Sequence, residues 1–127
     1  KLSYLWLDNP QEELPSLYEQ MKGRYISPNS TFEQFEAVFS AKPSDSFEPI
    51  RWHDDNASEV LYFILMLEQT SNISTSNKTD YQKLKACFVK PNGKPFTANF
   101  KVLKQNININ LSENKQKAID NLVINFA

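Results

Sequence analysis

The fold of this chain is decided by Ile50-Arg51-Trp52 and by the stretch 56–70, NASEVLYFILMLEQT. Asn56 is a typical helix N-cap, and Glu59 three residues later completes the pattern of a capping box. A run of consecutive apolar residues follows Glu59 and ends at Leu67. This run is too short to span a membrane and too apolar for a half-exposed helix. It therefore predicts a buried helix around which the rest of the chain packs.

The order of features around this helix recurs in the first half of the chain. In each half a Trp precedes an acidic turn, and a Leu-Tyr pair, an isoleucine and a closing apolar pair follow. The matching positions are Trp6 with Trp52, Leu17-Tyr18 with Leu61-Tyr62, Ile26 with Ile73, and Val38-Phe39 with Cys87-Phe88. The two Trp are 46 residues apart, which is the size of one supersecondary unit. The pattern favours a tandem repeat with parts 1–44 and 45–127 in one compact unit; a chance correspondence is the alternative, because two copies are few.

Hydrophobic periodicity predicts a mainly α fold with short β-strands. The expected helices are 11–22, 31–39, 56–70, 79–88, 97–104 and 112–126, and the expected short strands are 2–7, 50–52 and 105–111. The last strand is predicted because Asn and Ile alternate along it, although Asn is a poor strand former. Thr79 and Thr97 are the expected N-caps of their helices, and Pro15 should occupy a first turn, where its missing N–H costs least. The Pro- and Ser-rich stretch 42–48 is the expected linker.

Charge is distributed unevenly along the chain. The net charge is −1, yet residues 78–104 contain seven Lys and only one acidic residue, whereas residues 1–77 are acidic. Such a basic block is a candidate binding face. It contains a predicted turn, Pro91-Asn92-Gly93, with a lysine on either side. The candidate nucleic-acid-binding residues are Gln82, Lys83, Lys85, Lys90, Lys94, Lys101 and Lys104.

Each part is predicted to run strand, helix, polar turn and helix, and a turn with basic flanks follows in the second part. This is the element order of a winged helix or helix-turn-helix unit, in which the second helix faces the nucleic acid. The residues that carry a family resemblance are Ile50, Trp52, Leu61, Tyr62, Ile73 and Phe88. With their spacing, the chain resembles the carboxy-terminal part of RteC-type regulators, which promote excision of bacterial conjugative transposons, or an uncharacterised relative from the same kind of mobile element.

The resemblance implies a bacterial transcription regulator that binds double-stranded DNA. That family has an Arg-containing basic stretch after its second helix, whereas residues 93–104 of this chain contain lysine and no arginine. Base-specific contact is therefore less expected than contact with phosphates.

Catalytic and metal chemistry are not expected. His53 is the only histidine, and beside Asp54 and Asp55 it could be a metal ligand or an acid-base group, but a solvated histidine in a helix-entry turn is the preferred interpretation. Cys87 is the only cysteine, and its apolar surroundings favour a buried small side chain over a nucleophile. One Cys and one His cannot form a zinc cluster. We expect no enzyme activity, no metal and no cofactor.

The chain has no signal-peptide pattern and no long apolar run, so we expect a cytoplasmic protein with no membrane contact. Asn-x-Ser/Thr triplets, such as those that begin at Asn29, Asn56, Asn72 and Asn77, leave a secreted origin open, although a chain with thirteen Asn contains such triplets by accident. It begins with Lys1, which indicates a fragment or a processed form. Two classes of function remain: a regulator that binds nucleic acid, and a protein-interaction or structural module without nucleic-acid contact.

Overall fold

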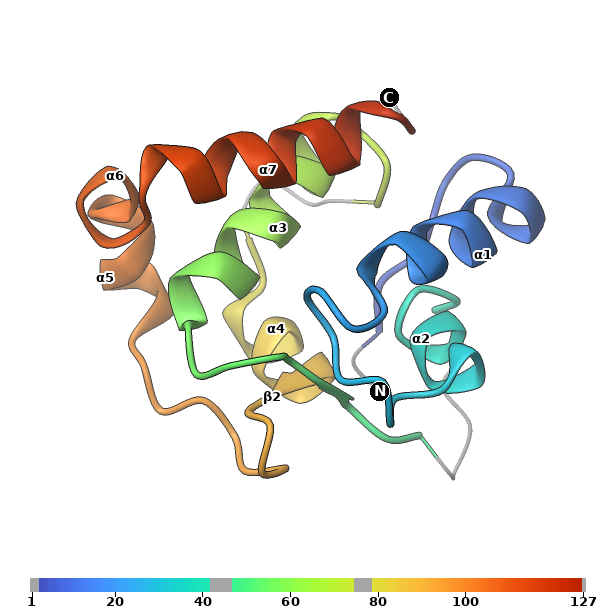
Figure 1. Cartoon of the computed structure of the whole chain (residues 1–127), viewed down its shortest axis with the longest axis horizontal. Coiled ribbons are helices and arrows are strands. Elements are labelled where there is room, and N and C mark those ends of the chain that lie inside the picture. Colours follow the sequence, from blue (N-terminus) through green and yellow to red (C-terminus); the bar gives the residue numbers. More distant parts are fainter. Residues whose placement is uncertain (1–2, 42–46, 75–78, 127) are drawn as a thin grey trace.

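The computed structural model describes residues 3–41, 47–74 and 79–126. In this part of the chain the fold is mainly helical with one short two-stranded sheet, which confirms the predicted class (Figure 1). The elements are α1 Pro10–Met21, α2 Phe32–Val38, β1 Ile50–Arg51, α3 Ala57–Gln69, α4 Tyr81–Cys87, β2 Phe88–Val89, α5 Phe100–Gln105, α6 Ile107–Asn110 and α7 Glu113–Ile124. No helix in these ranges combines the length and the apolar character needed to cross a membrane.

Helix α3 is the centre of the fold, as its apolar sequence predicts. Helices α5, α6 and α7 pack against it, and α7 lies across it in Figure 1. Its buried apolar residues are Val60, Leu61, Phe63, Ile64 and Leu67. Helices α1 and α2 contact each other on the other side of the molecule, and all these elements contribute to one hydrophobic core.

Side-chain caps begin most of the helices, although two of the predicted caps were wrong. The Asn56 side chain accepts a hydrogen bond from the Glu59 amide at 3.2 Å, as predicted, but the Glu59 carboxylate does not return to Asn56. Helix α4 is capped by Asp80 rather than Thr79, and α5 is capped by Asn99 rather than Thr97. Asp and Asn are stronger N-caps than Thr, and the helices begin where those residues stand.

The strand predicted over 105–111 is wrong, because this stretch forms the end of α5 and the short helix α6. The Asn106 side chain donates to the Val102 carbonyl at 3.0 Å, and the Leu111 amide donates to the Ile107 carbonyl at 2.9 Å. Local hydrogen bonds of this kind satisfy the backbone without a partner strand. Strict alternation suits a strand only if one face is buried, but Ile109 is 83% exposed.

Two smaller expectations at the amino-terminal end also fail. Residues 3–7 form isolated bridges at Leu5 and Trp6 rather than a continuous strand. Pro15 lies in the second turn of α1, since the helix begins at Pro10. Pro15 is exposed, as is Gln11, whose carbonyl would otherwise accept from position 15, so water can replace the missing hydrogen bond.

The same indole contact occurs in both halves. Trp6 Nε1 donates to Glu13 Oε1 at 2.9 Å, and Trp52 Nε1 donates to Glu59 Oε1 at 2.8 Å. The two Trp are 46 residues apart, and so are the two Glu. Each Glu lies near the start of a core helix. Each indole is thereby fixed against the beginning of its own helix.

Backbone hydrogen bonds cross between the halves in matching pairs. The Ser27 amide donates to the Arg51 carbonyl and the Ser74 amide to the Leu5 carbonyl, each at 2.9 Å. In the same pattern Trp52 forms a bridge with Ile26, while Trp6 forms a bridge with Ile73. The segment that carries each Trp therefore pairs with the segment that follows the core helix of the other half.

Tyr62 joins α3 to α7 through a contact that should depend on pH. Its hydroxyl donates to Asp120 Oδ1 at 2.6 Å, and burial, with the hydrogen bond to Asp120, raises the pKa of Tyr62 to about 12. The unfolded phenol has a pKa of about 10, so this stabilisation is complete below about pH 10 and is lost as the pH rises towards 12. We expect Tyr62→Phe to cost about 1 kcal/mol at neutral pH and to remove this alkaline loss. Urea denaturation of both proteins across that pH range measures it; parallel pH profiles would contradict the linkage.

Candidate nucleic-acid interface

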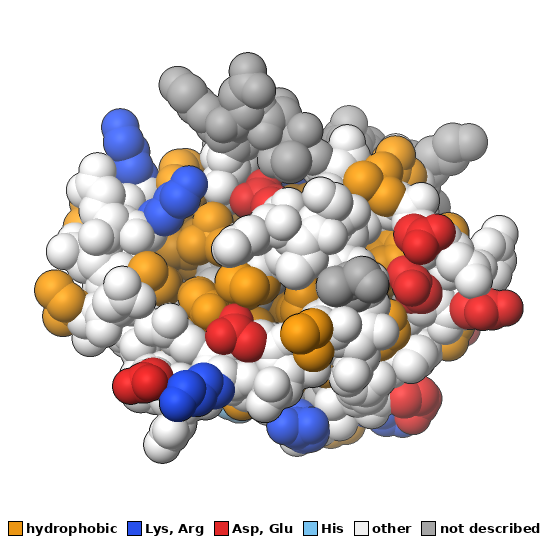
Figure 2. Space-filling model, turned by 90° about the horizontal axis from the view of Figure 1, so that it is seen from above, with side chains coloured by type: hydrophobic (Ala, Val, Ile, Leu, Met, Phe, Trp, Pro, Cys, Tyr) orange, Lys and Arg blue, Asp and Glu red, His pale blue; other side chains and the backbone are white. Residues whose placement is uncertain are grey.

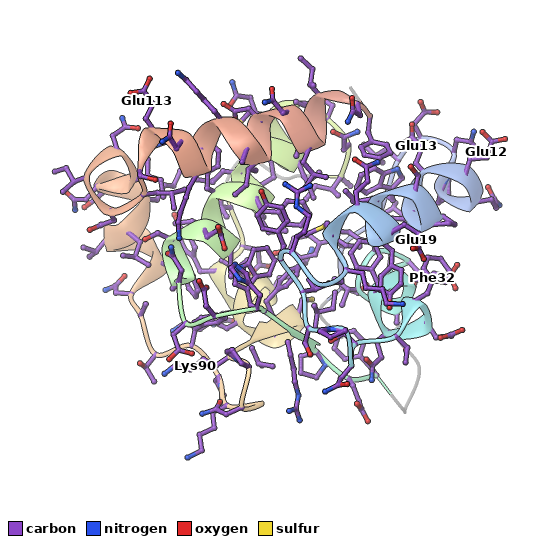
Figure 3. The ribbon with its side chains drawn as sticks, in the orientation of Figure 1. Glu12, Glu13, Glu19, Phe32, Lys90 and Glu113 are labelled. Atoms are coloured by element: carbon purple, nitrogen blue, oxygen red, sulfur yellow. The ribbon has the colours of Figure 1, made fainter. Side chains whose placement is uncertain are left out.

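A tight hairpin projects from the second half of the chain. β1 and β2 are parallel neighbours, with Arg51 opposite Val89, and Val89 then forms an antiparallel bridge with Pro95. The Lys90 amide donates to the Lys94 carbonyl at 2.9 Å and closes the turn. We call residues 89–95 the basic hairpin; it is part of the orange loop at the bottom of Figure 1, and Figure 3 labels Lys90 there.

Gly93 allows the basic hairpin to approach the neighbouring strand. Its φ of 85° lies in the left-handed region, which residues other than glycine rarely adopt. A Cβ at this position would lie 3.0 Å from a terminal guanidinium nitrogen of Arg51. The turn geometry therefore favours glycine here, and a larger residue would also crowd the end of the Arg51 side chain.

Arg51 is a cation of this surface that is absent from the residues predicted from the sequence. Its guanidinium Nη1 donates to the Pro91 carbonyl at 3.2 Å, which holds the side chain over the basic hairpin. Forty residues separate the two in sequence, and only the parallel register of β1 and β2 brings them together. The sequence predicted the strand 50–52 that carries Arg51, but no feature of the sequence indicated which strand it pairs with. Arg51 thus lies beside the two lysines of the basic hairpin.

The remaining predicted residues lie on α4 and α5. Gln82, Lys85, Lys101 and Lys104 are exposed. Lys85 Nζ lies 5.9 Å from the centre of the Phe100 ring, at the start of α5. Lys85 therefore lies beside the start of α5, the helix that carries Lys101 and Lys104.

Two predicted lysines have other contacts. Lys83 is half-buried, and its Nζ lies 5.3 Å from the centre of the Tyr4 ring in the first half. Lys104 Nζ lies 3.5 Å from Thr79 Oγ1, and that hydroxyl donates to Glu68 Oε1 at 2.9 Å. The ammonium groups of Lys83 and Lys104 therefore already contact other residues of the protein. They are weaker candidates for phosphate contact than Lys85, Lys94 and Lys101.

The acidic side chains of α1 and α2 lie away from the basic hairpin, whereas Glu48 lines the same hollow as Arg51, Val89 and Gly93. Helices α1 and α2 carry exposed carboxylates at Glu12, Glu33 and Glu36. Figure 2 shows Asp and Glu side chains concentrated at the end of the molecule where α1 lies, and Figure 3 places Glu12 and Glu19 far from Lys90. A polyanion would therefore be attracted to one side of the molecule and repelled from the other.

His53 lies exposed in the turn before α3, as expected, and its side chain also contacts two carboxylates. His53 Nε2 lies 2.5 Å from Glu59 Oε1 and 3.6 Å from Asp54 Oδ1, and these three side chains form a possible metal-binding group. Glu59 is almost fully buried and already accepts from the Trp52 indole. Asp54 Oδ1 accepts from the Asn56 amide at 3.0 Å. The group is satisfied by hydrogen bonds within the protein.

We expect that no metal binds at this group. Ligands of a tetrahedral ion are separated by roughly 3.3 Å given bonds of about 2.0–2.1 Å, whereas the His53 and Glu59 atoms are at hydrogen-bond distance, 2.5 Å. A metal held by these two atoms would have to separate them. We expect calorimetric titration with zinc to show no stoichiometric binding, and one equivalent of binding that disappears in His53→Ala would contradict this.

Cys87 is not a candidate nucleophile. The residue is fully buried, and burial raises the pKa of its thiol to about 12. Nearby Lys83 lowers this pKa but does not offset the burial. The thiolate, which is the reactive form, is therefore scarce at neutral pH.

Comparison of the chain with protein-family models, with curated proteins and with solved structures finds no match in any of the three. Function must therefore be inferred from the residues and their geometry.

Proposed function

We propose that this chain is a nucleic-acid-binding regulatory domain without enzymatic activity, from a cytoplasmic protein of a bacterial mobile element. In this proposal, parts 1–44 and 45–127 are tandem strand-helix-turn-helix units, and the second, winged-helix-like unit binds double-stranded DNA. The observation that supports the proposal is the guanidinium of Arg51 on the basic hairpin, beside Lys90 and Lys94. Arg51 of β1 and the two lysines of the basic hairpin form one group of three cations, remote from helices α1 and α2, and such a group suits a phosphate backbone.

The matched contacts of the two halves support the tandem arrangement. The indole-carboxylate pairs recur at the same interval, and the crossing backbone hydrogen bonds occur in reciprocal pairs. A repeated unit explains both features more simply than chance does. In the second unit α3 and α4 take the places of the two helices of a helix-turn-helix, and the basic hairpin takes the place of the wing.

The chemistry of the interface favours phosphate contact over base recognition. Helix α4 has only seven residues and exposes Gln82 and Lys85, so few side chains could reach base edges. Lysine is a point charge that discriminates bases poorly, and Arg51 already donates to Pro91. We therefore propose that the domain binds duplex DNA mainly through its backbone, with little dependence on sequence.

A single lysine change provides a matched test. We expect Lys94→Ala to weaken binding to unrelated DNA duplexes equally and to flatten the log-log salt dependence by about 0.9, the value for one phosphate contact. The control is Lys117→Ala on α7, because that lysine is also exposed but forms an ion pair with Glu113 at 3.2 Å. Fluorescence anisotropy with labelled duplexes measures both variants. Equal effects of the two changes would contradict the assignment of the interface.

A further inference from the structure

A hollow in the first half of the chain differs in chemistry from the basic hairpin. Its volume is about 210 Å³, and its floor is formed by the buried side chains of Trp6, Leu14 and Phe39. The rim includes Leu5, which is 44% exposed, and Glu36 on α2. A dry cavity of about 150 Å³ accommodates a benzene molecule, so this hollow has room for one large apolar side chain.

The position of this hollow corresponds to the basic surface of the second half. Leu5 stands 46 residues before Arg51, the interval that also separates the two Trp. Glu36 stands 49 residues before Lys85. The same interval separates Phe39 from Phe88, and both of these rings are buried. Where the second half presents two cations, the first half presents an exposed leucine and a carboxylate. The two surfaces therefore suit different ligands.

We propose that the hollow bounded by Leu5 and Glu36 binds a protein segment in which one large apolar side chain is flanked by lysine or arginine. The apolar floor would bury that side chain, which removes its apolar surface from water. Exposed carboxylates on the two bordering helices, including Glu12 and Glu33, complement the basic flanks. A nucleic acid would be repelled from this side. The inference is independent of the proposed DNA interface.

The test uses a defined peptide as the probe. Isotope-labelled protein is titrated with a short synthetic peptide that carries one central Phe between two pairs of lysines, and its amide signals are followed by NMR. We expect saturable shifts at Leu5, Glu36 and Ser40, and at least about tenfold weaker binding when Ala replaces the central Phe, because the apolar burial is then largely removed. Leu5→Lys should abolish these shifts. Ile109→Lys, the same type of change at an exposed residue of α6, should preserve them.

Three results would overturn the proposal. Equal, unsaturable shifts with the Phe and Ala peptides would show attraction by surface charge alone. Shifts at the same amides on increasing protein concentration without peptide, abolished in Leu5→Lys, would show that a second copy of this chain occupies the hollow. Unchanged peptide binding by Leu5→Lys would place the site elsewhere. A dispersed spectrum of the variant confirms in each case that it is folded.

Discussion

Replacing Trp52 by alanine should lower the free energy of unfolding by about 3–5 kcal/mol, because the change removes a large buried ring and leaves a cavity. The side chain is fully buried, and the rings of Tyr25, Phe63 and Phe88 lie 5.9–6.0 Å from its centre. The change also removes one donor from the nearly buried Glu59 carboxylate. A single domain of this size has a total stability of about 5–15 kcal/mol, so the loss is a large fraction of it. The midpoint of urea denaturation, followed by circular dichroism, measures the effect.

Trp52→Phe provides a variant that should remain folded if the alanine variant does not. It keeps most of the apolar ring and loses the indole N–H, so its cost should reflect the loss of one of the two hydrogen-bond partners of Glu59 Oε1, about 1–3 kcal/mol. Trp6→Ala is the matched change in the first half, where the indole is also buried and bonded to a glutamate. A denaturation midpoint that Trp52→Ala leaves unchanged would show that this ring is peripheral to the fold.

Removing Arg51 and the two lysines of the basic hairpin together should reduce DNA affinity by about 500-fold at about 0.1 M salt. Each phosphate contact contributes roughly 0.9 to the slope of log K against log salt concentration. Three contacts therefore raise log K by about 2.7 between about 1 M and about 0.1 M salt, and the variant lacks this gain. The variant is Arg51→Ala, Lys90→Ala and Lys94→Ala. These side chains are exposed or half-buried, so the fold should persist. Anisotropy titration with a labelled duplex measures the decrease in affinity.

The control for this variant removes the same number and type of charges elsewhere. Arg24, which follows α1, and Lys115 and Lys117 of α7 are exposed, and changing all three to alanine alters the net charge equally. We expect this control to retain nearly all of the affinity. If both triple variants lose affinity to the same extent, net charge and not the basic hairpin determines binding.

Much of the fold follows from local patterns that the sequence displays directly. The apolar run of α3 and the stripe of α7, with Ile119, Leu122 and Val123 buried, are identified by periodicity alone. The interval between Trp6 and Trp52 also points to the matching contacts of the two halves. These signals are strong because burial and helical spacing depend on residues close together in sequence.

What could not be predicted depends on contacts between distant segments. Nothing near Arg51 indicates that its strand pairs with residues after α4, so the sequence does not reveal the best-placed cation of the candidate interface. The pairing of His53 with Glu59 is equally hidden, because Glu59 lies within a helix whereas two aspartates follow the histidine directly. The strand predicted over 105–111 is wrong because alternation cannot reveal whether either face will be buried.

The salt dependence of duplex DNA binding by the unmodified chain tests the central claim most directly. Arg51, Lys85, Lys90, Lys94 and Lys101 are the cations assigned to phosphates, and about 0.9 per contact gives a log-log slope of about −4.5. Anisotropy titrations of one labelled duplex at several salt concentrations give the slope. A slope near this value, similar for unrelated sequences, is the predicted result. Undetectable binding at the lowest salt concentration would contradict the proposal that this chain binds nucleic acid.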